Sequence, residues 1–303
     1  MLKRFELHNH TTESDARISC AELLNIMLRE NVDAFALTDH NTISGHRIMQ
    51  KLIAESNTPV RCIYGMEYTT YYGHILCLNL HRYVPWDRID RRHPELLFAA
   101  CKQSGALTGV AHPFSYGDPF ARGCRFEMTI HDFSNVDYIE IFNNANPLHE
   151  VNAKSLAWWE SLVLQGEHLA ATAGMDLHGD RDMSNAFATY AEGSPDGDPA
   201  QELTQAIQTQ RTWVSKGMAV EWQTTPDEIA FTLTDLHKPG FTPKPPYLLT
   251  LTTPQGTQTH SICETEPLRL PIESLPGKIL IPKLYTQNTA LENLLCIAPV
   301  LRL

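Results

Sequence analysis

The chain has 303 residues, of which 43% are hydrophobic and 19% are charged, so it can bury one large core and still form a second, smaller domain. Its net charge of −11 argues against binding long duplex nucleic acid, which requires many lysine and arginine contacts to phosphates. No apolar run approaches the ~20 residues of a membrane span, and the start Met1-Leu2-Lys3-Arg4 opens no signal-like apolar stretch. We therefore expect a cytoplasmic protein without a membrane partner; composition does not indicate its oligomeric state.

Five short apolar runs, typical of buried strands, are each followed within two residues by imidazole or carboxylate side chains. The runs cover residues 5–7, 34–37, 61–66, 107–111 and 169–175. Strands that alternate with helices form parallel sheets, and such folds place catalytic residues at the carboxyl ends of the strands. The pattern predicts an α/β fold, a (β/α) barrel with a polar cluster at its C-terminal mouth.

Nine side chains that can ligate metals follow these runs in the first 178 residues. They are His8, His10, Asp15, His40, Glu67, His74, His112, Asp176 and His178. Imidazole and carboxylate together suit Zn²⁺, Mn²⁺ and Fe²⁺, and nine ligands are enough for two or three ions. One His-x-His pair is weak evidence in a chain with 14 histidines, but the ordered set of nine predicts a multinuclear metallohydrolase.

The motifs around these ligands resemble, in order, those of the PHP (polymerase and histidinol phosphatase) family. They are Glu6–Asp15, Ala36–Gly45, Gly65–Thr70 with Gly73–Leu76, Ala111–Pro113 and Gly174–His178. The resemblance spans roughly residues 1 to 218 and is greatest to the stand-alone, CehA/McbA-like phosphoesterases. It implies a distorted (β/α)7 PHP barrel.

The resemblance also implies how the ligands divide among divalent ions. One ion would be held by His8, His10, Glu67 and Asp176, a second by Glu67, His74 and His112, and a third by Asp15, His40 and His178. Asp15 stands where trinuclear members often have histidine, and it keeps a hard oxygen ligand, so the sequence leaves two or three Zn, Mn or Fe ions open. Glu67, the implied bridge, and Asp176 are the predicted catalytic residues.

Adjacent divalent ions lower the pKa of water from ~15.7 to about 7 and clamp the attacking and leaving oxygens of a phosphoryl group. The expected reaction is hydrolysis of a phosphomonoester or phosphodiester by a metal-bridging hydroxide. The expected substrate is a small phosphorylated metabolite, a nucleotide or a short oligonucleotide. The alternatives are a metal-dependent hydrolase of a carbamate, carboxylic ester or amide, and a noncatalytic metal-binding protein. Arginines that converge on the cluster would favour phosphate, and an apolar aromatic pocket would favour a carbonyl substrate.

Three residues are predicted to bind the substrate. Arg122 and Arg125 follow His112 in the chain, and the planar guanidinium matches phosphate oxygens. Either could instead be an ordinary surface arginine. A polar residue is also expected at Asn143 or Asn144, with Asn144 preferred, although a turn residue that satisfies local backbone groups is an equal interpretation. His46, Arg47 and Lys216 are weaker candidates.

The pattern changes after the last ligand motif. Residues 192–199 are rich in turn formers, 200–210 show helical spacing, and 212–217 resemble a final strand and turn. Short strand-like runs rich in threonine and proline follow. We predict a PHP metallohydrolase barrel over residues 1–218 and a small β-rich domain over 219–303, whose expected role is packing or dimer contact.

Overall fold

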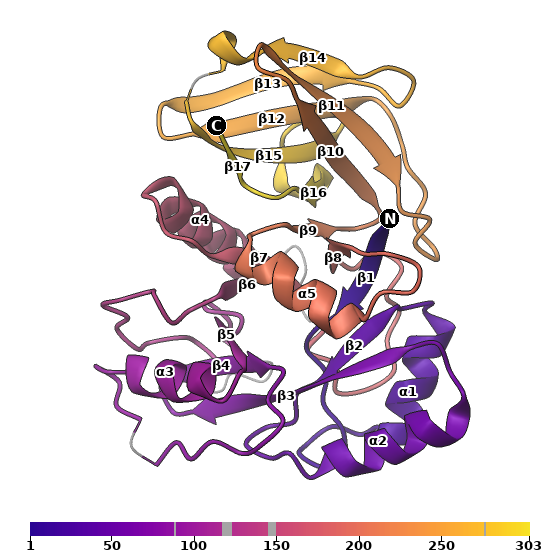
Figure 1. Cartoon of the computed structure of the whole chain (residues 1–303), viewed down its shortest axis with the longest axis vertical. Helices are drawn as coiled ribbons and strands as arrows, with labels where there is room; N and C mark the ends of the chain where they lie inside the picture. The colour runs from indigo at the N-terminus through magenta and orange to yellow at the C-terminus, as the bar shows by residue number, and fades with distance from the viewer. Residues whose placement is uncertain (88, 117–122, 145–149, 276) are drawn as a thin grey trace.

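The computed structural model describes residues 1–87, 89–116, 123–144, 150–275 and 277–303. The N-terminal region, which runs to residue 217, combines helices with strands, and the C-terminal region that follows is almost entirely β-structure and lies on one side of it (Figure 1). The α/β class predicted for the first region is thus confirmed.

The N-terminal region contains nine strands and five α-helices among the described residues. The strands are β1 (Leu2–Glu6), β2 (Ala34–Leu37), β3 (Arg61–Thr70), β4 (Gly73–Leu78), β5 (Leu107–Val110), β6 (Tyr138–Asn143), β7 (Ala170–Gly174), β8 (Ala188–Glu192) and β9 (Thr212–Ser215). The helices are α1 (Cys20–Arg29), α2 (Gly45–Ser56), α3 (Glu95–Gln103), α4 (Glu150–Leu164) and α5 (Pro199–Gln208). Helix α5 begins after the capping residue Asp198 and has a proline in its first turn. It overlaps the helix predicted over residues 200–210.

The strands pair in the order β9-β8-β1-β2-β3-β4-β5-β6-β7. Neighbours are parallel except around β4 and β8, which run antiparallel to both of their partners. The ends of the layer meet through side chains: Thr212 Oγ1 donates to Ala171 O at 2.7 Å, and Thr189 Oγ1 accepts from Ala173 N at 2.9 Å. The strands therefore curve toward closure, but the described elements do not repeat βα seven times, because β3 and β4 form a hairpin. The (β/α)7 barrel stays a prediction.

Two apolar layers hold these strands. One lies inside the curve, where Phe5, Ile63 and Tyr138 pack with Leu203 and Ile207 of α5. The other lies outside β4–β7, where it is covered by α3 and α4 and includes the fully buried Trp159. Layers on both faces fix the strand ends, and the site is built on those ends.

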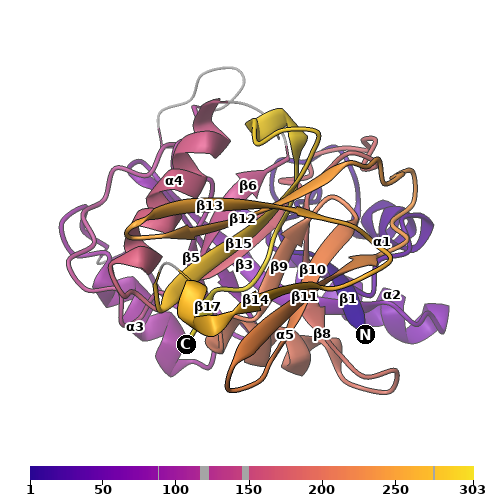
Figure 2. The same cartoon turned by 90° about the horizontal axis from the view of Figure 1, so that it is seen from above.

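The C-terminal region consists of two packed sheets (Figure 2). Its elements are β10 (Met218–Thr224), β11 (Glu228–Asp235), β12 (Tyr247–Thr253), β13 (Gly256–Ile262), β14 (Leu268–Pro271), β15 (Ile279–Thr286), β16 (Leu294–Ile297) and β17 (Leu301–Arg302), with short 3-10 turns at Ile272–Ser274 and Leu291–Asn293. The sheet β10-β11-β14 packs on β12 and β15 through Phe231, Leu249 and Leu284.

A backbone ladder joins the two regions, because β16 pairs antiparallel with β9. Lys283 of β15 also donates to Glu160 of α4 at 2.5 Å, which ties the same sheet to a helix of the N-terminal region. A boundary at residues 218 and 219 would fall at the first residues of β10, and it stays a prediction. None of the described helices combines the length and the apolar character that crossing a bilayer demands.

The contact between β5 and β6 gives a test of the fold. A Cβ added to Gly109 would lie 2.2–2.5 Å from three carbons of the Tyr138 ring, whose hydroxyl donates to Leu76 O at 2.7 Å. We expect Gly109→Ala to lower the free energy of unfolding by about 1–3 kcal/mol, because the buried ring has no room to move. Urea denaturation measures this. Gly179→Ala, where a Cβ meets nothing within 4 Å, should change stability by no more than about 0.5 kcal/mol. Equal stability of the two variants would contradict the packing.

Candidate metal centre

The nine predicted ligands all lie at one end of the strands. His8 and His10 follow β1, Asp15 precedes α1, His40 follows β2, Glu67 lies in β3, His74 lies in β4, His112 follows β5, and Asp176 and His178 follow β7. Isolated backbone bridges join Asn9 to Leu177 and His40 to Glu67, so the loops stay in register beyond the strands. The antiparallel β4 contributes because its hairpin with β3 pairs His74 with Thr69.

Glu67 is the centre of this group, which we call the histidine–carboxylate cluster. Its side chain is fully buried. Oε1 lies 2.9 Å from His74 Nδ1, 3.1 Å from His112 Nε2 and 3.3 Å from His8 Nε2. Oε2 lies 2.8 Å from His40 Nδ1 and 3.6 Å from His10 Nε2. One carboxylate therefore contacts imidazoles from four segments of the chain.

Asp176 and Asp15 extend the cluster toward solvent. Asp176 Oδ1 lies 3.1 Å from His10 Nε2 and 3.5 Å from His8 Nε2. Asp15 Oδ1 lies 3.2 Å from His178 Nε2 and 3.5 Å from His40 Nε2. Asp15 is the most exposed member, with 60% of its side chain accessible, so this end of the cluster is open to water and ligands.

The nine side chains form four overlapping groups whose potential ligand atoms lie within 4.8 Å of one another. The groups are His8, His10 and Glu67; His8, His112 and Asp176; His40, Glu67 and His74; and His10, Asp15, His40 and His178. Asp15, His40 and His178 thus lie together, as the resemblance implies for one ion. His74 and His112 fall into different groups, so the division of ligands among ions stays a prediction.

Glu140 is a buried carboxylate of β6 that the sequence interpretation missed as part of the site. Its Oε1 lies 2.9 Å from His8 Nδ1, and its Oε2 accepts the backbone N–H of His112 at 2.9 Å. A carboxylate on Nδ1 fixes the ring so that Nε2 faces the cluster, an arrangement common among metal-binding histidines. The signal was a charge within the apolar run Ile139-Glu140-Ile141.

Asp39 is a second missed residue, and it shapes the loop between His10 and Asp15. Its Oδ1 accepts from Thr11 N and from Ser14 Oγ, both at 2.7 Å, and its Oδ2 accepts from Thr11 Oγ1 at 2.9 Å. Its oxygens hold the segment that carries Asp15. The signal in the sequence was a carboxylate directly before the predicted ligand His40.

Burial and charge act in opposite directions on the cluster histidines. Burial lowers the pKa of His10 to about 4 and also lowers that of His74, which favours the neutral imidazole that metals bind. Burial also opposes the charge on His8 and His112, but nearby carboxylates outweigh it: the pKa of His8 rises well above its usual value and that of His112 rises to about 9.

The pKa values of the two central carboxylates, Glu67 and Asp176, are lowered. Burial alone would raise the pKa of Glu67 and of Asp176, yet the surrounding histidines hold both well below their usual range. The cluster therefore carries ionised carboxylates at neutral pH. A divalent cation would take the place of the protons that these carboxylates keep on His8 and His112.

The three predicted substrate-binding residues differ in where they lie and in what they contact. Arg122 lies outside the described residues. Arg125 is exposed and follows Cys124, whose carbonyl lies 3.1 Å from His112 Nδ1. The amide of Asn144 bonds to Gly174 O and to both backbone groups of Phe187, so these bonds occupy it, whereas Asn143 Nδ2 donates to Asp176 Oδ2 at 3.0 Å. Asn143, the less favoured of the two, is the one that reaches the cluster; the substrate contacts themselves stay predictions.

The contact between Glu140 and His8 leads to a test of the metal site. We expect Glu140→Gln to lower the affinity for a divalent metal about 10–100-fold, because the ring of His8 loses its charged partner. Competition with a chromogenic chelator measures the affinity. Glu55→Gln removes an exposed carboxylate of α2 and should leave it unchanged. Equal affinities of the two variants would show that Glu140 does not support the site.

His46, a weaker candidate from the sequence, has a structural role with a pH signature. It is buried, and its Nε2 lies 2.8 Å from Gly65 O. Burial lowers its pKa, so below about pH 6.5 the unfolded state binds the proton more readily and stability falls as pH falls. In His46→Gln, the loss of unfolding free energy between about pH 7.5 and about pH 5 should be smaller than in the wild type. His237→Gln, at a largely exposed position, should keep the wild-type slope; the same slope in His46→Gln would refute this role.

Comparison with known proteins gives local sequence matches and a fold. No family model matches the chain. A 100-residue segment is 33% identical to a 5′-3′ exoribonuclease of Haemophilus influenzae and covers 32% of this chain and 32% of that protein. Another match, 29% identical over 121 residues, is to an uncharacterized protein of Methanocaldococcus jannaschii and covers 40% of this chain and 64% of the relative. The chain thus spans less than two thirds of the length of either relative.

A solved structure matches nearly the whole chain. It is a two-domain protein from Bacteroides vulgatus described as containing a predicted PHP-like metal-dependent phosphoesterase. The TM-score is 0.57 at 15% identity, over 99% of this chain and 95% of that chain. At this identity the match reports on fold and leaves the CehA/McbA branch a prediction. The expected resemblance is confirmed at the level of the fold: the chain is folded like this protein, which is described as containing a predicted PHP-like phosphoesterase.

Proposed function

We propose that this chain is a metal-dependent phosphoesterase of the PHP family. The observation that carries the proposal is the Glu67 carboxylate, which is fully buried and has both oxygens within 3.6 Å of histidine nitrogens, five histidines in all. A buried carboxylate among imidazoles that are themselves held by carboxylates has the donor set of a multinuclear site for Zn²⁺, Mn²⁺ or Fe²⁺.

The residues present fit such ions. His8 Nε2 is buried and, among the described residues, makes no hydrogen bond, while it faces Glu67 and Asp176. The nine cluster residues would hold two or three divalent ions. Glu67 belongs to two of the four groups, so it would serve more than one ion. When bound, divalent ions lower the pKa of water and neutralise the charge that develops on a transferring phosphoryl group.

The chain's own residues would orient the reacting groups. Glu140 fixes the ring of His8, and Asn143 holds one oxygen of Asp176, which leaves the other directed at His10. Asp39 holds the loop of Asp15 at the open end. We infer that the substrate enters at this end, because Asp15 and His178 are the most accessible members of the cluster.

The proposed substrate is a small phosphorylated metabolite, a nucleotide or a short oligonucleotide. The partial match to an exoribonuclease supports a phosphate ester over a carbonyl substrate. The net charge of −11 supports a short substrate over a long duplex. Arg125, in the segment that contacts His112 through Cys124, is the described arginine proposed to reach a phosphate. We also propose a cytoplasmic location.

A metal-reconstitution assay tests the function. Metal-stripped protein receives Mn²⁺, Zn²⁺ or Fe²⁺ and a panel of p-nitrophenyl phosphate, bis-p-nitrophenyl phosphate, nucleoside 5′-monophosphates, short oligoribonucleotides and p-nitrophenyl acetate. We expect metal-dependent turnover of a phosphate ester. Glu67→Gln and His40→Ala should each lower kcat/KM at least ~100-fold, because metals contribute several kcal/mol of charge stabilisation.

The control is His237→Ala, which removes a largely exposed histidine outside the cluster and should keep wild-type activity. Full activity and full metal content in both cluster variants would refute the site. Turnover of the acetate ester alone would favour the rival hydrolase of carbonyl substrates. Metal binding without turnover of any compound would favour a noncatalytic protein.

A further inference from the structure

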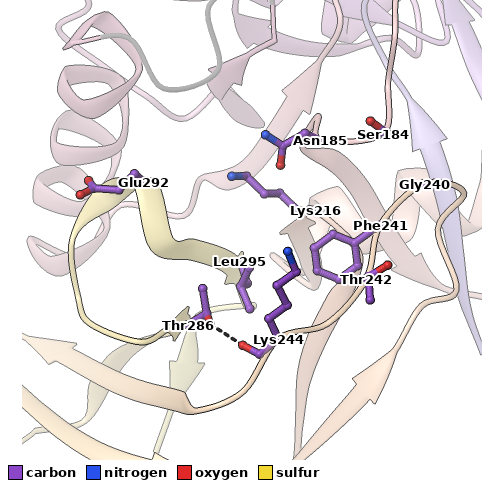
Figure 3. A pocket seen from close by; sticks show the side chains of 10 residues that line it. All are labelled: Ser184, Asn185, Lys216, Gly240, Phe241, Thr242, Lys244, Thr286, Glu292 and Leu295. Atoms are coloured by element: carbon purple, nitrogen blue, oxygen red, sulfur yellow. Dashed lines mark hydrogen bonds between the residues drawn. The ribbon is translucent and has the colours of Figure 1, made fainter.

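A second polar pocket, separate from the cluster residues, lies where the two regions of the chain meet (Figure 3). Its volume is about 450 Å³. One wall is the segment before β8 with the end of β9, and the other is formed by the C-terminal region. The polar residues that line it are Ser184, Asn185, Lys216, Thr242, Lys244 and Glu292.

Lys216 is the unusual member of this pocket. It directly follows β9 and is only 4% exposed, and its backbone N–H donates to Leu295 O at 2.9 Å. Its Nζ lies 5.0 Å from the centre of the Phe187 ring. Throughout the described part of the chain, no hydrogen-bond acceptor or carboxylate pairs with this ammonium group. Burial without an acidic partner lowers the pKa of Lys216, so an anion in the pocket would stabilise its charged form.

Lys244 adds a second positive charge. Figure 3 shows the side chains of Lys216 and Lys244 both directed into the pocket, while the Glu292 carboxylate points away from them. Neither ammonium group forms an ion pair with Glu292 or with another carboxylate of the described residues. The side chains of Asn185 and Thr242 line the same space and carry hydrogen-bond donors.

The walls of the pocket are firmly held. Lys238 Nζ donates to Met183 O, Ser184 O and Ala186 O at 2.6, 2.9 and 2.9 Å, which ties the segment before β8 to the C-terminal region. Gly217 packs so closely on Phe241 that an added Cβ would lie 2.5 Å from the ring. The spacing between the two walls is therefore set by packed contacts.

We propose that this pocket binds a phosphate group, with Lys216 and Lys244 as its cationic partners and Asn185 and Thr242 as hydrogen-bond donors. The ligand is free inorganic phosphate or a small phosphomonoester. The site is distinct from the metal centre: Lys216 packs on Phe187, which belongs to the apolar layer outside the strands, whereas the layer inside them includes Phe5 and Leu7, just before His8. The inference therefore does not require that the chain be a phosphoesterase.

Calorimetric titration of metal-stripped protein tests the proposal, since without metal a phosphomonoester is bound but not hydrolysed. The probes are inorganic phosphate and ribose 5-phosphate. We expect Lys216→Met and Lys244→Met each to weaken binding at least ~10-fold, because each variant loses one of the two lysine ammonium groups that contact the anion. Lys278→Met removes an exposed lysine of the C-terminal region and should bind as the wild type does.

His112→Ala separates the pocket from the metal centre and should leave phosphate binding unchanged. Tighter binding of inorganic phosphate would identify the free anion as the ligand, and tighter binding of ribose 5-phosphate would identify a phosphomonoester; both support the pocket. Unaltered binding in Lys216→Met and Lys244→Met, a loss in His112→Ala, or no binding to the wild type would overturn it. Thermal melting checks that each variant is folded. If Lys216→Met does not fold, the phosphate affinity of Lys244→Met, a variant of an exposed lysine, tests the proposal.

Discussion

The burial of one carboxylate is the constraint on which the site depends. A charge as deeply buried as that of Glu67 costs several kcal/mol unless partners compensate for it. The partners are imidazoles, and they arrive from the ends of β1, β2 and β5 and from the hairpin strand β4. The strands must therefore end at one level and on one side, and the two apolar layers around them hold that arrangement.

The supporting carboxylates show how the charges are kept in place. Glu140 contacts both His8 and the backbone of His112, and Asp39 binds Thr11 and Ser14. No hydrogen bond joins either carboxylate to the Glu67 side chain, although the backbone carbonyl of Asp39 accepts from Glu67 N at 3.3 Å. Each carboxylate fixes a segment that carries ligands. His112 and Asp176 adopt positive φ angles of 26° and 50°, uncommon for residues other than glycine, and such strain concentrates at functional sites. Packing and hydrogen bonds around the cluster hold these conformations.

The C-terminal region is part of the same construction. Its sheet continues the strand layer through β16 and β9, and its Lys238 holds the segment that precedes β8. That segment leads to Phe187, which stacks on Phe142 with ring centres 4.1 Å apart and bonds to Asn144, next to Asn143 at the cluster. Contacts thus run without a break from the metal centre to the region that follows it.

The sequence by itself determined the nine clustered side chains, the α/β class and the helix over 200–210, because ligand spacing, apolar runs and cap residues act locally. The tertiary structure decided the rest. It assigned Glu140 and Asp39 their supporting contacts, chose Asn143 over Asn144 as the neighbour of Asp176, and made β4 and β8 antiparallel. It also left Lys216 buried against Phe187. The physical reason is that a side chain's partner across the sheet depends on register and closure, which are set by contacts between residues far apart in the chain.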